Sequence, residues 1–129
     1  MTEKFQELTG KTLTPAENGN IQFVFDGSVA ENGYRLSIAQ EKTTITAADL
    51  RGFVMAVENF LKLIDGDTIP ACDIQDAPFM EFRGVHLFMP SMAQMDFAKR
   101  LIKYILSPSG YNYVILEMGA SMRFDSHPE

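Results

Sequence analysis

Three short segments in the first half of the chain alternate apolar and polar residues. Because successive side chains of a strand point to opposite faces, this alternation predicts β-strands at residues 20–25, 34–40 and 43–47. The second and third segments are expected to form a β-hairpin. Glu41 and Lys42 lie between them without the glycine that a tight two-residue turn favours, so we expect a longer or irregular turn.

Hydrophobic residues then recur every three or four positions from Leu50 to Ile64. This spacing predicts an amphipathic helix of about four turns, and Thr46 or Asp49 can cap its start. Gly52 lies inside this helix, where glycine costs about 1 kcal/mol relative to alanine. A glycine at this place favours close packing of the helix against the sheet.

Weaker patterns flank these elements. Residues 2–9 predict a short helix that ends at Gly10, and residues 72–74 of a proline-containing linker predict a short edge strand. One core is expected between the sheet and the long helix. Its predicted members are Phe23, Leu36, Ile38, Ile45, Phe53, Val57, Phe60 and Leu61.

The second half of the chain predicts a different kind of structure. Residues 82–89 and 111–118 are strands that are apolar on both faces, and residues 92–106 between them have the spacing of an amphipathic helix. Strand, helix and strand form a βαβ unit with parallel strands, and eight such units close into a barrel. The predicted class is therefore α/β, with a small antiparallel sheet and helices at residues 1–76 and one βαβ unit of an incomplete (β/α)8 barrel at residues 77–129.

Composition excludes several classes of protein. A net charge of −6 and scattered basic residues argue against nucleic acid as a partner, because binding phosphates needs clustered Lys and Arg. No apolar run approaches the ~20 residues that a membrane helix needs. The N-terminus is polar, so no signal peptide is recognised and the location of the chain stays open. Cys72 is the single cysteine, which excludes an internal disulfide and favours an inert apolar role.

Few residues are candidates for chemistry. Glu117 lies at the end of a predicted barrel-type strand, where active sites of that fold are built, so it is our candidate substrate-binding residue; the alternative is a solvated strand-end carboxylate. For His86, in the middle of a strand, we prefer a core or interface position over a ligand or pH-sensing role. His127, in a polar tail, is assigned no role.

No metal site or cofactor is expected. Two histidines without a zinc-type spacing make no zinc site. Four aspartates lie near the linker but lack the spacing of a calcium loop, so we interpret them as solvated side chains; they are Asp65, Asp67, Asp73 and Asp76.

An ordered set of short motifs resembles one enzyme family. The motifs are Gly33-Tyr34-Arg35-Leu36, Thr44-Ile45-Thr46-Ala47, Gly52, Leu61, Ile69-Pro70, Asp76-Ala77-Pro78 and Arg83-Gly84. Their order and spacing over residues 5–88 resemble the N-terminal region of glycoside hydrolase family 20, the β-N-acetylhexosaminidases. The resemblance implies a small non-catalytic domain followed by the first strands of a catalytic barrel, and a further strand before Thr2. It also implies a parent enzyme that acts on N-acetylhexosamine-containing or related glycans, in the periplasm or outside the cell.

The sequence departs from the family where substrate is bound. The family's first barrel strand leads to an Asp and then an Arg that holds sugar hydroxyls, but Phe88 and Ser91 stand at these positions. The second strand usually brings histidines near its end, where this chain has Ile115 and Glu117. The family's Asp–Glu pair on the fourth strand protonates the leaving oxygen while the substrate's acetamide attacks. No catalytic residue can be assigned in this chain.

Two functions from different classes remain open. The first is the non-catalytic N-terminal part of a glycosidase, which is inactive alone and meets carbohydrate only through its parent enzyme. The second is a stand-alone protein-interaction module. In either case residues 79–118 need a partner, because both strands are apolar on two faces. The expected partner is the remainder of the barrel or a second copy of the chain in a homo-oligomer.

Overall fold

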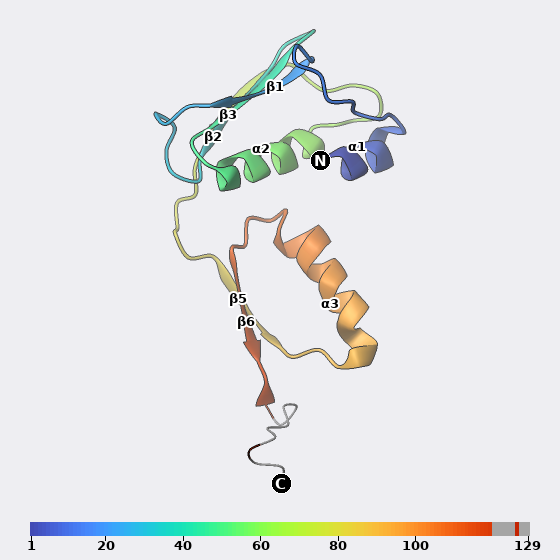
Figure 1. Cartoon of the computed structure of the whole chain (residues 1–129), viewed down its shortest axis with the longest axis vertical. Coiled ribbons are helices and arrows are strands. Elements are labelled where there is room, and N and C mark those ends of the chain that lie inside the picture. The colour runs from blue at the N-terminus through green and yellow to red at the C-terminus, as the bar shows by residue number, and fades with distance from the viewer. Residues whose placement is uncertain (120–125, 127–129) are drawn as a thin grey trace. The chain divides into compact units, whose positions relative to one another are not determined.

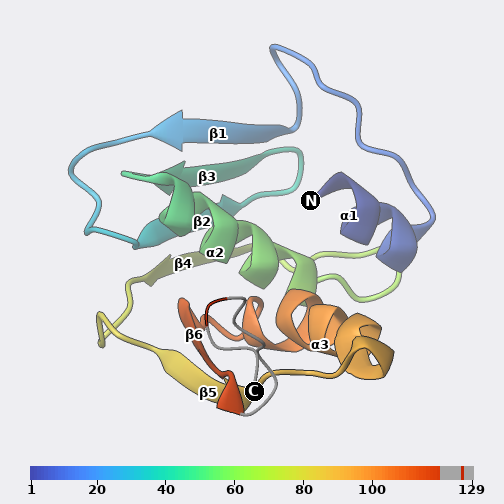
Figure 2. The same cartoon turned by 60° about the horizontal axis from the view of Figure 1, so that its bottom comes forward.

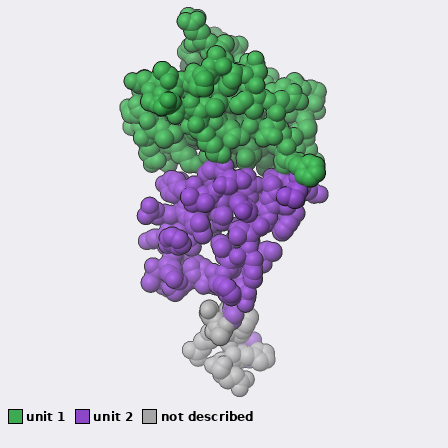
Figure 3. Space-filling view, turned by 180° about the vertical axis from the view of Figure 1, so that it is seen from behind, with its two compact units in different colours: residues 1–79 green, residues 80–129 purple. Residues whose placement is uncertain are grey.

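A computed structural model describes residues 1–119 and Ser126 of the chain (Figure 1). It divides into two compact units, Met1–Phe79 and Met80–Glu129, which Figure 3 distinguishes by colour. Within the described residues, no helix has both the length and the apolar character needed to cross a bilayer. Each unit is described separately below.

A four-stranded sheet forms the centre of the first unit. Its strands are β1 (Ile21–Phe25), β2 (Tyr34–Ile38), β3 (Thr43–Ala47) and β4 (Cys72–Asp76). They lie in the order β1-β3-β2-β4, and Figure 2 shows α2 (Leu50–Lys62) lying along one face of the sheet. The predicted strands, the hairpin and the edge strand at the linker are therefore confirmed.

The direction of β1 corrects the prediction of an antiparallel sheet. β2 is antiparallel to both β3 and β4, but β1 runs parallel to β3, so the sheet is mixed and the unit is an α+β structure. The connection at residues 26–33 is long enough to leave a gap one strand wide between β1 and β2. β3 fills this gap and pairs with both strands. Alternation of residue types identifies strands but says nothing of their order.

The hairpin turn has the expected irregular length. β2 ends at Ile38 and β3 begins at Thr43, and the Ala39 N–H donates to the Lys42 carbonyl oxygen at 2.8 Å. The side chain of Asn20 donates to the Glu41 carbonyl oxygen at 2.7 Å. The turn is thereby tied to the residue before β1.

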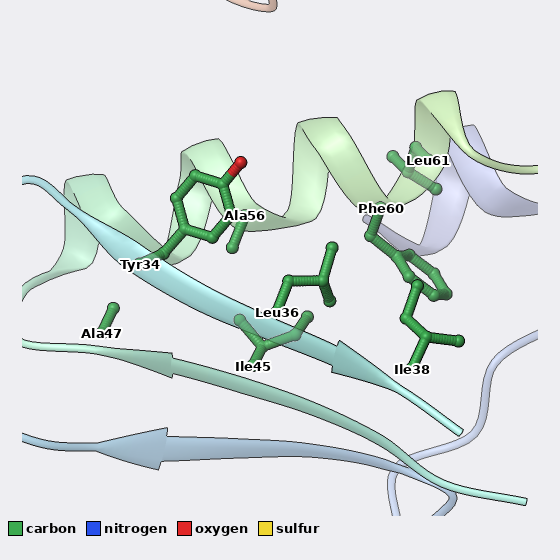
Figure 4. Close-up of a cluster of buried hydrophobic side chains, with 8 residues drawn as sticks. All are labelled: Tyr34, Leu36, Ile38, Ile45, Ala47, Ala56, Phe60 and Leu61. Atoms are coloured by element: carbon green, nitrogen blue, oxygen red, sulfur yellow. The ribbon is translucent and has the colours of Figure 1, made fainter. Parts of the chain in front are cut away.

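The core of the first unit lies between α2 and the sheet, as Figure 4 shows. Of the predicted members, Leu36, Ile38, Ile45, Phe60 and Leu61 are buried, while Phe53 and Val57 are partly buried against them. The prediction is wrong for Phe23, which is 52% exposed because β1 is an edge strand. Its ring meets Phe53 edge-on, with centroids 5.8 Å apart.

The pattern missed three core members. Ala47 and Ala56 are fully buried, and Tyr34 is 3% exposed. The Tyr34 hydroxyl accepts a hydrogen bond from the Asn59 amide at 2.6 Å. Burial raises the pKa of Tyr34 despite this hydrogen bond, so the ring belongs to the core in its neutral form.

Asp49, rather than Thr46, caps the start of α2. Its carboxylate accepts from the Gly52 N–H at 2.8 Å and from the Asn32 N–H at 2.6 Å. Burial raises the pKa of Asp49, but the backbone donors together outweigh it and hold the pKa below its usual value. Leu50 directly after the cap is 77% exposed, and Val54 is also exposed, so neither belongs to the buried stripe.

Two terminal elements complete the first unit. Helix α1 (Thr2–Thr9) ends, as predicted, at Gly10, which adopts a left-handed conformation with φ 69°. Phe5 packs against the core. The Lys4 ammonium lies 2.6 Å from the Glu58 carboxylate, which links α1 to α2.

The second unit is a strand–helix–strand structure with parallel strands. β5 (Gly84–Phe88) pairs in parallel with β6 (Tyr113–Glu117), as predicted. The segment between them is helical but irregular: a 3-10 turn (Met92–Gln94), α3 (Met95–Leu101) and a π-helical turn (Ile102–Leu106). In that last turn the Ser107 N–H bonds to the Ile102 carbonyl oxygen at 3.0 Å, five residues back.

The prediction of close packing at Gly52 is confirmed. A Cβ atom at this residue would lie 2.2 Å from the Gly33 carbonyl oxygen and 3.0 Å from the Ala47 Cβ. Both neighbours are parts of the sheet or its margin, so they cannot rotate away as a flexible side chain would. Glycine here sets the distance between α2 and the sheet.

Gly52→Ala is therefore expected to destabilise the first unit by about 1–3 kcal/mol, the range for overpacking, despite alanine's better helix propensity. Urea unfolding followed by circular dichroism measures the change. The matched control is Gly27→Ala, because a Cβ at Gly27 meets no atom within 4 Å. The control should change stability by less than about 0.5 kcal/mol. Equal midpoints for the two variants would contradict this packing role.

Candidate functional site

The amino-terminal ends of β5 and β6 are joined by hydrogen bonds between Arg83 and Asn112. The Arg83 N–H donates to Asn112 Oδ1 at 2.9 Å, and the Asn112 N–H donates to the Arg83 carbonyl oxygen at 3.0 Å. The amide of Asn112 also donates to the Glu81 carbonyl oxygen at 2.7 Å. One asparagine side chain thus fixes both the pairing of the strands and the path of the chain before β5.

The Arg83 guanidinium holds backbone rather than a ligand. Its Nε donates to the Gly110 carbonyl oxygen at 2.8 Å, and Nη1 donates to the Met80 carbonyl oxygen. The sequence marked Arg83 only as part of a family motif and gave Asn112 no role. Asparagine directly before an apolar strand is the signal that could have identified this contact.

Aromatic rings cover the same end of the strand pair. The ring of Phe82 lies over Gly84, where a Cβ atom would come within 2.5 Å of it. It also packs against Tyr113, with ring centroids 4.7 Å apart. The face of the strand pair that carries Gly84 and Tyr113 is therefore apolar at its amino-terminal end.

The two faces of the β5–β6 pair differ in what lies against them. Leu87 and Leu116 line an open groove of about 440 Å³ together with Phe97 and Ile102, and Phe88 at the end of β5 also borders it. The register places His86, Phe88, Ile115 and Glu117 on the opposite face. All four are exposed. The sequence-predicted residue Glu117 thus lies on the face away from the helix, at the carboxyl end of its strand.

The side chains of Glu117 and His86 lie in contact on that face. The Nε2 atom of His86 lies 3.0 Å from Oε2 of Glu117, and the two side chains are 55% and 47% exposed. The two residues are diagonal neighbours, since Glu117 pairs with Phe88 and His86 pairs with Ile115. A contact this exposed contributes at most about 1 kcal/mol to stability. Of the two positions expected for His86, the core is wrong in the described structure, because no layer covers this face, and the interface stays a prediction.

The described residues offer no further cluster of catalytic groups beside this pair. Within residues 80–119 the carboxylates are Glu81, Asp96 and Glu117, and Glu117 alone ends a strand. In the part of the chain that the structure describes, no three His, Cys, Asp or Glu side chains gather where they could hold a metal ion. His127 lies outside the described residues.

Comparison with known proteins identifies the family. The model of "Glycosyl hydrolase family 20, domain 2" matches residues 2–77. The chain belongs to glycosyl hydrolase family 20. The N,N'-diacetylchitobiase of Vibrio harveyi is 35% identical over 78 residues, which are 57% of this chain and 8% of that protein. The resemblance inferred from the ordered motifs is thereby confirmed.

Solved family 20 structures extend the likeness beyond the matched domain. A β-N-acetylglucosaminidase of Vibrio harveyi, in complex with N-acetylglucosamine, has a TM-score of 0.77 and 26% identity over 90% of this chain and 19% of its own. The β-N-acetylhexosaminidase of Streptomyces coelicolor has a TM-score of 0.73 over 98% of this chain and 30% of its own; at 23% identity it shows the fold alone. The chain spans less than a third of each of these relatives.

The role of Asn112 in this family 20 chain can be measured. Asn112→Ala removes hydrogen bonds to both Arg83 and Glu81, so residues 83–117 should lose about 1–3 kcal/mol of local stability. Native-state hydrogen exchange reports this loss as faster exchange of the β5 and β6 amides. The matched control is Asn18→Ala in an exposed turn of the first unit. Unchanged protection of β5 and β6 in Asn112→Ala would show that the contact is dispensable.

Proposed function

We propose that this chain is the small non-catalytic domain of a family 20 glycosidase together with the first strand, helix and strand of its catalytic barrel. Alone it is inactive. Its role is to form and support one side of the barrel, and its partner is the remainder of that barrel. The substrates of the assembled enzyme are glycans that contain N-acetylhexosamine.

One observation carries this proposal: the apolar side chains of β6 stay exposed on both faces of the strand. Its residues Tyr113, Val114, Ile115 and Leu116 are 38 to 54% exposed although three of them are aliphatic. Parallel strands of this apolar kind are normally buried on both faces. In a (β/α)8 barrel neighbouring strands cover the edges, side chains fill the interior, and helices cover the outside. Within the described residues, the β5–β6 pair has one helix beside it. In the same part of the chain it has no neighbouring strands at its edges and no layer of side chains packed on its other face.

The substrate class is supported by the relatives. One is named a diacetylchitobiase, and one solved structure holds N-acetylglucosamine. The comparisons give no support to a stand-alone interaction module. Glu117 is the residue of this chain that we assign to substrate binding, because it lies at the carboxyl end of a barrel-type strand, where this fold builds its sites.

The chain alone should not hydrolyse aryl N-acetylglucosaminides or other aryl glycosides. Hydrolysis of this kind needs a positioned acid and a second carboxylate, whereas Glu117 stands alone at the strand ends within residues 80–119. A release assay with purified protein measures this. Turnover that Glu117→Gln abolishes would overturn the proposal and make Glu117 catalytic.

The purified chain should associate with itself when no barrel remainder is present, because a second copy can cover the same apolar surface. Phe88→Asp should then give monomer or aggregate in light scattering. The matched control is Phe25→Asp in the first unit, since Phe25 is 73% exposed and Phe88 is 76% exposed. A stable wild-type monomer at roughly tens of micromolar, the range of ordinary micromolar interfaces, would contradict the need for a partner.

A further inference from the structure

We infer that Asn18 is a site of spontaneous covalent modification, at which the side-chain amide is converted to a carboxylic acid through a cyclic imide. The reactants are the main-chain nitrogen of Gly19 and water, so the reaction needs no enzyme and no cofactor. The inference is independent of the proposed function. It rests on two identical tetrapeptides that the structure holds in different ways.

The tetrapeptide Ala-Glu-Asn-Gly occurs twice in the chain, at residues 16–19 and 30–33. Each copy forms a turn shortly before a strand, which is β1 for the first copy and β2 for the second. Asparagine before glycine favours imide formation, because glycine has no Cβ to hinder the approach of its nitrogen to the asparagine side chain. By residue type alone, Asn18 and Asn32 are therefore equally reactive.

The second copy is held rigidly. The Gly33 N–H donates to the Ala30 carbonyl oxygen at 2.9 Å, and the Asn32 N–H donates to the Asp49 carboxylate at 2.6 Å. Gly33 is buried, and a Cβ atom there would lie 3.0 Å from the carbonyl oxygens of Ala30 and Asp76. The nitrogen that would react is thus bonded elsewhere, and the main chain around it has no room to turn.

The first copy lacks these restraints. Glu17 and Asn18 are exposed, and Gly19 is partly buried. Among the described residues, no hydrogen bond of normal length and angle holds the main-chain N–H of Asn18 or of Gly19. A Cβ atom at Gly19 would have its nearest neighbours 3.7 to 3.8 Å away, which is ordinary contact. Rotation of the main chain can therefore bring the Gly19 nitrogen to Asn18 Cγ while the sheet stays intact.

The reaction has two steps in which all atoms are accounted for. The Gly19 nitrogen gives its proton to water and bonds to Asn18 Cγ, while the Cγ–Nδ2 bond breaks and Nδ2 leaves as ammonia with a proton from water. Water then adds to one of the two carbonyl groups of the imide and breaks the bond from that carbonyl to the Gly19 nitrogen. Attack at Cγ gives aspartate, whereas attack at the main-chain carbonyl gives isoaspartate. No atom is oxidised or reduced.

The product lies close to a contact that ties β1 to the turn between β2 and β3. The Asn20 carbonyl oxygen accepts from the Thr43 N–H at 2.7 Å, and the Asn20 side chain donates to the Glu41 carbonyl oxygen at 2.7 Å. Isoaspartate in place of Asn18 adds a carbon atom to the main chain and a negative charge to the residues just before Asn20. Modification should loosen this contact, so aged protein should differ locally from new protein.

Incubation of the purified full chain at mildly alkaline pH tests the inference. Peptide mass spectrometry measures the acid formed at each asparagine, and methylation by an isoaspartate-specific carboxyl methyltransferase measures isoaspartate. Asn18 should convert at least about ten-fold faster than Asn32, because Asn32 can react only when its turn opens. In urea both should convert at similar rates, since the two tetrapeptides are identical. Equal rates in the folded chain would overturn the inference, and so would an Asn18 that converts only in urea.

Two variants separate the reacting nitrogen from the protection of the second site. Gly19→Ala should slow conversion of Asn18 about ten-fold, because the added methyl group hinders the nitrogen, and the space around Gly19 allows the variant to fold. An unchanged rate would exclude attack by Gly19. Asp49→Ala should raise conversion of Asn32 towards its rate in urea, because the bond to the Asn32 N–H is lost. An unchanged Asn32 rate would contradict protection by this turn.

Native-state hydrogen exchange measures the structural effect of the modification. The Thr43 amide should exchange faster after incubation in wild type, and its exchange should stay unchanged in Gly19→Ala, which keeps its asparagine. Unchanged exchange of Thr43 in fully converted wild type would overturn the loosening of the contact at Asn20.

Discussion

A parallel pair of strands must be covered on both faces and at both edges, and this constraint governs the second unit. One helix lies along one face of β5 and β6, where Val114 and Leu116 are still 38% and 45% exposed, and the other face and the open edges meet solvent in the described structure. The backbone is nevertheless regular, with five residues of each strand in register. The local fold is therefore set within residues 80–119, while the burial that normally stabilises such a fold has to come from elsewhere.

The first unit has a mixed sheet, which needs cover on one face only, and it supplies that cover by itself. Its sheet buries one face against α2, and its polar face carries Arg35, Ser37, Thr44 and Thr46 toward solvent. Gly52 brings the helix close enough for Leu36, Ile45 and Phe60 to be almost fully buried.

Features that depend on local residue pattern could be predicted from the sequence. Features that depend on which strands become neighbours in the sheet could not. Strand and helix positions follow from periodicity, and the cap at Asp49 and the close contact at Gly52 follow from single residues with one strong preference. The parallel pairing of β1 arises because β3 lies between β1 and β2 in the sheet. This strand order also leaves β1 at the edge, where Phe23 is exposed. Glu117 could be identified from its place at the end of a strand. Its contact with His86 could not, because the contact depends on the register between two strands whose paired residues, such as Gly84 and Tyr113, are 29 positions apart.

The contact between Arg83 and Asn112 has a consequence for the order of folding. The two residues are 29 positions apart, so the chain closes only a short loop, with α3 inside it, when they meet. Contacts that close short loops form early, because the entropy lost on closure is small. The contact can thus align β5 with β6 before any other strand arrives. A barrel that grows from this pair would add its later strands to an edge whose register is already set.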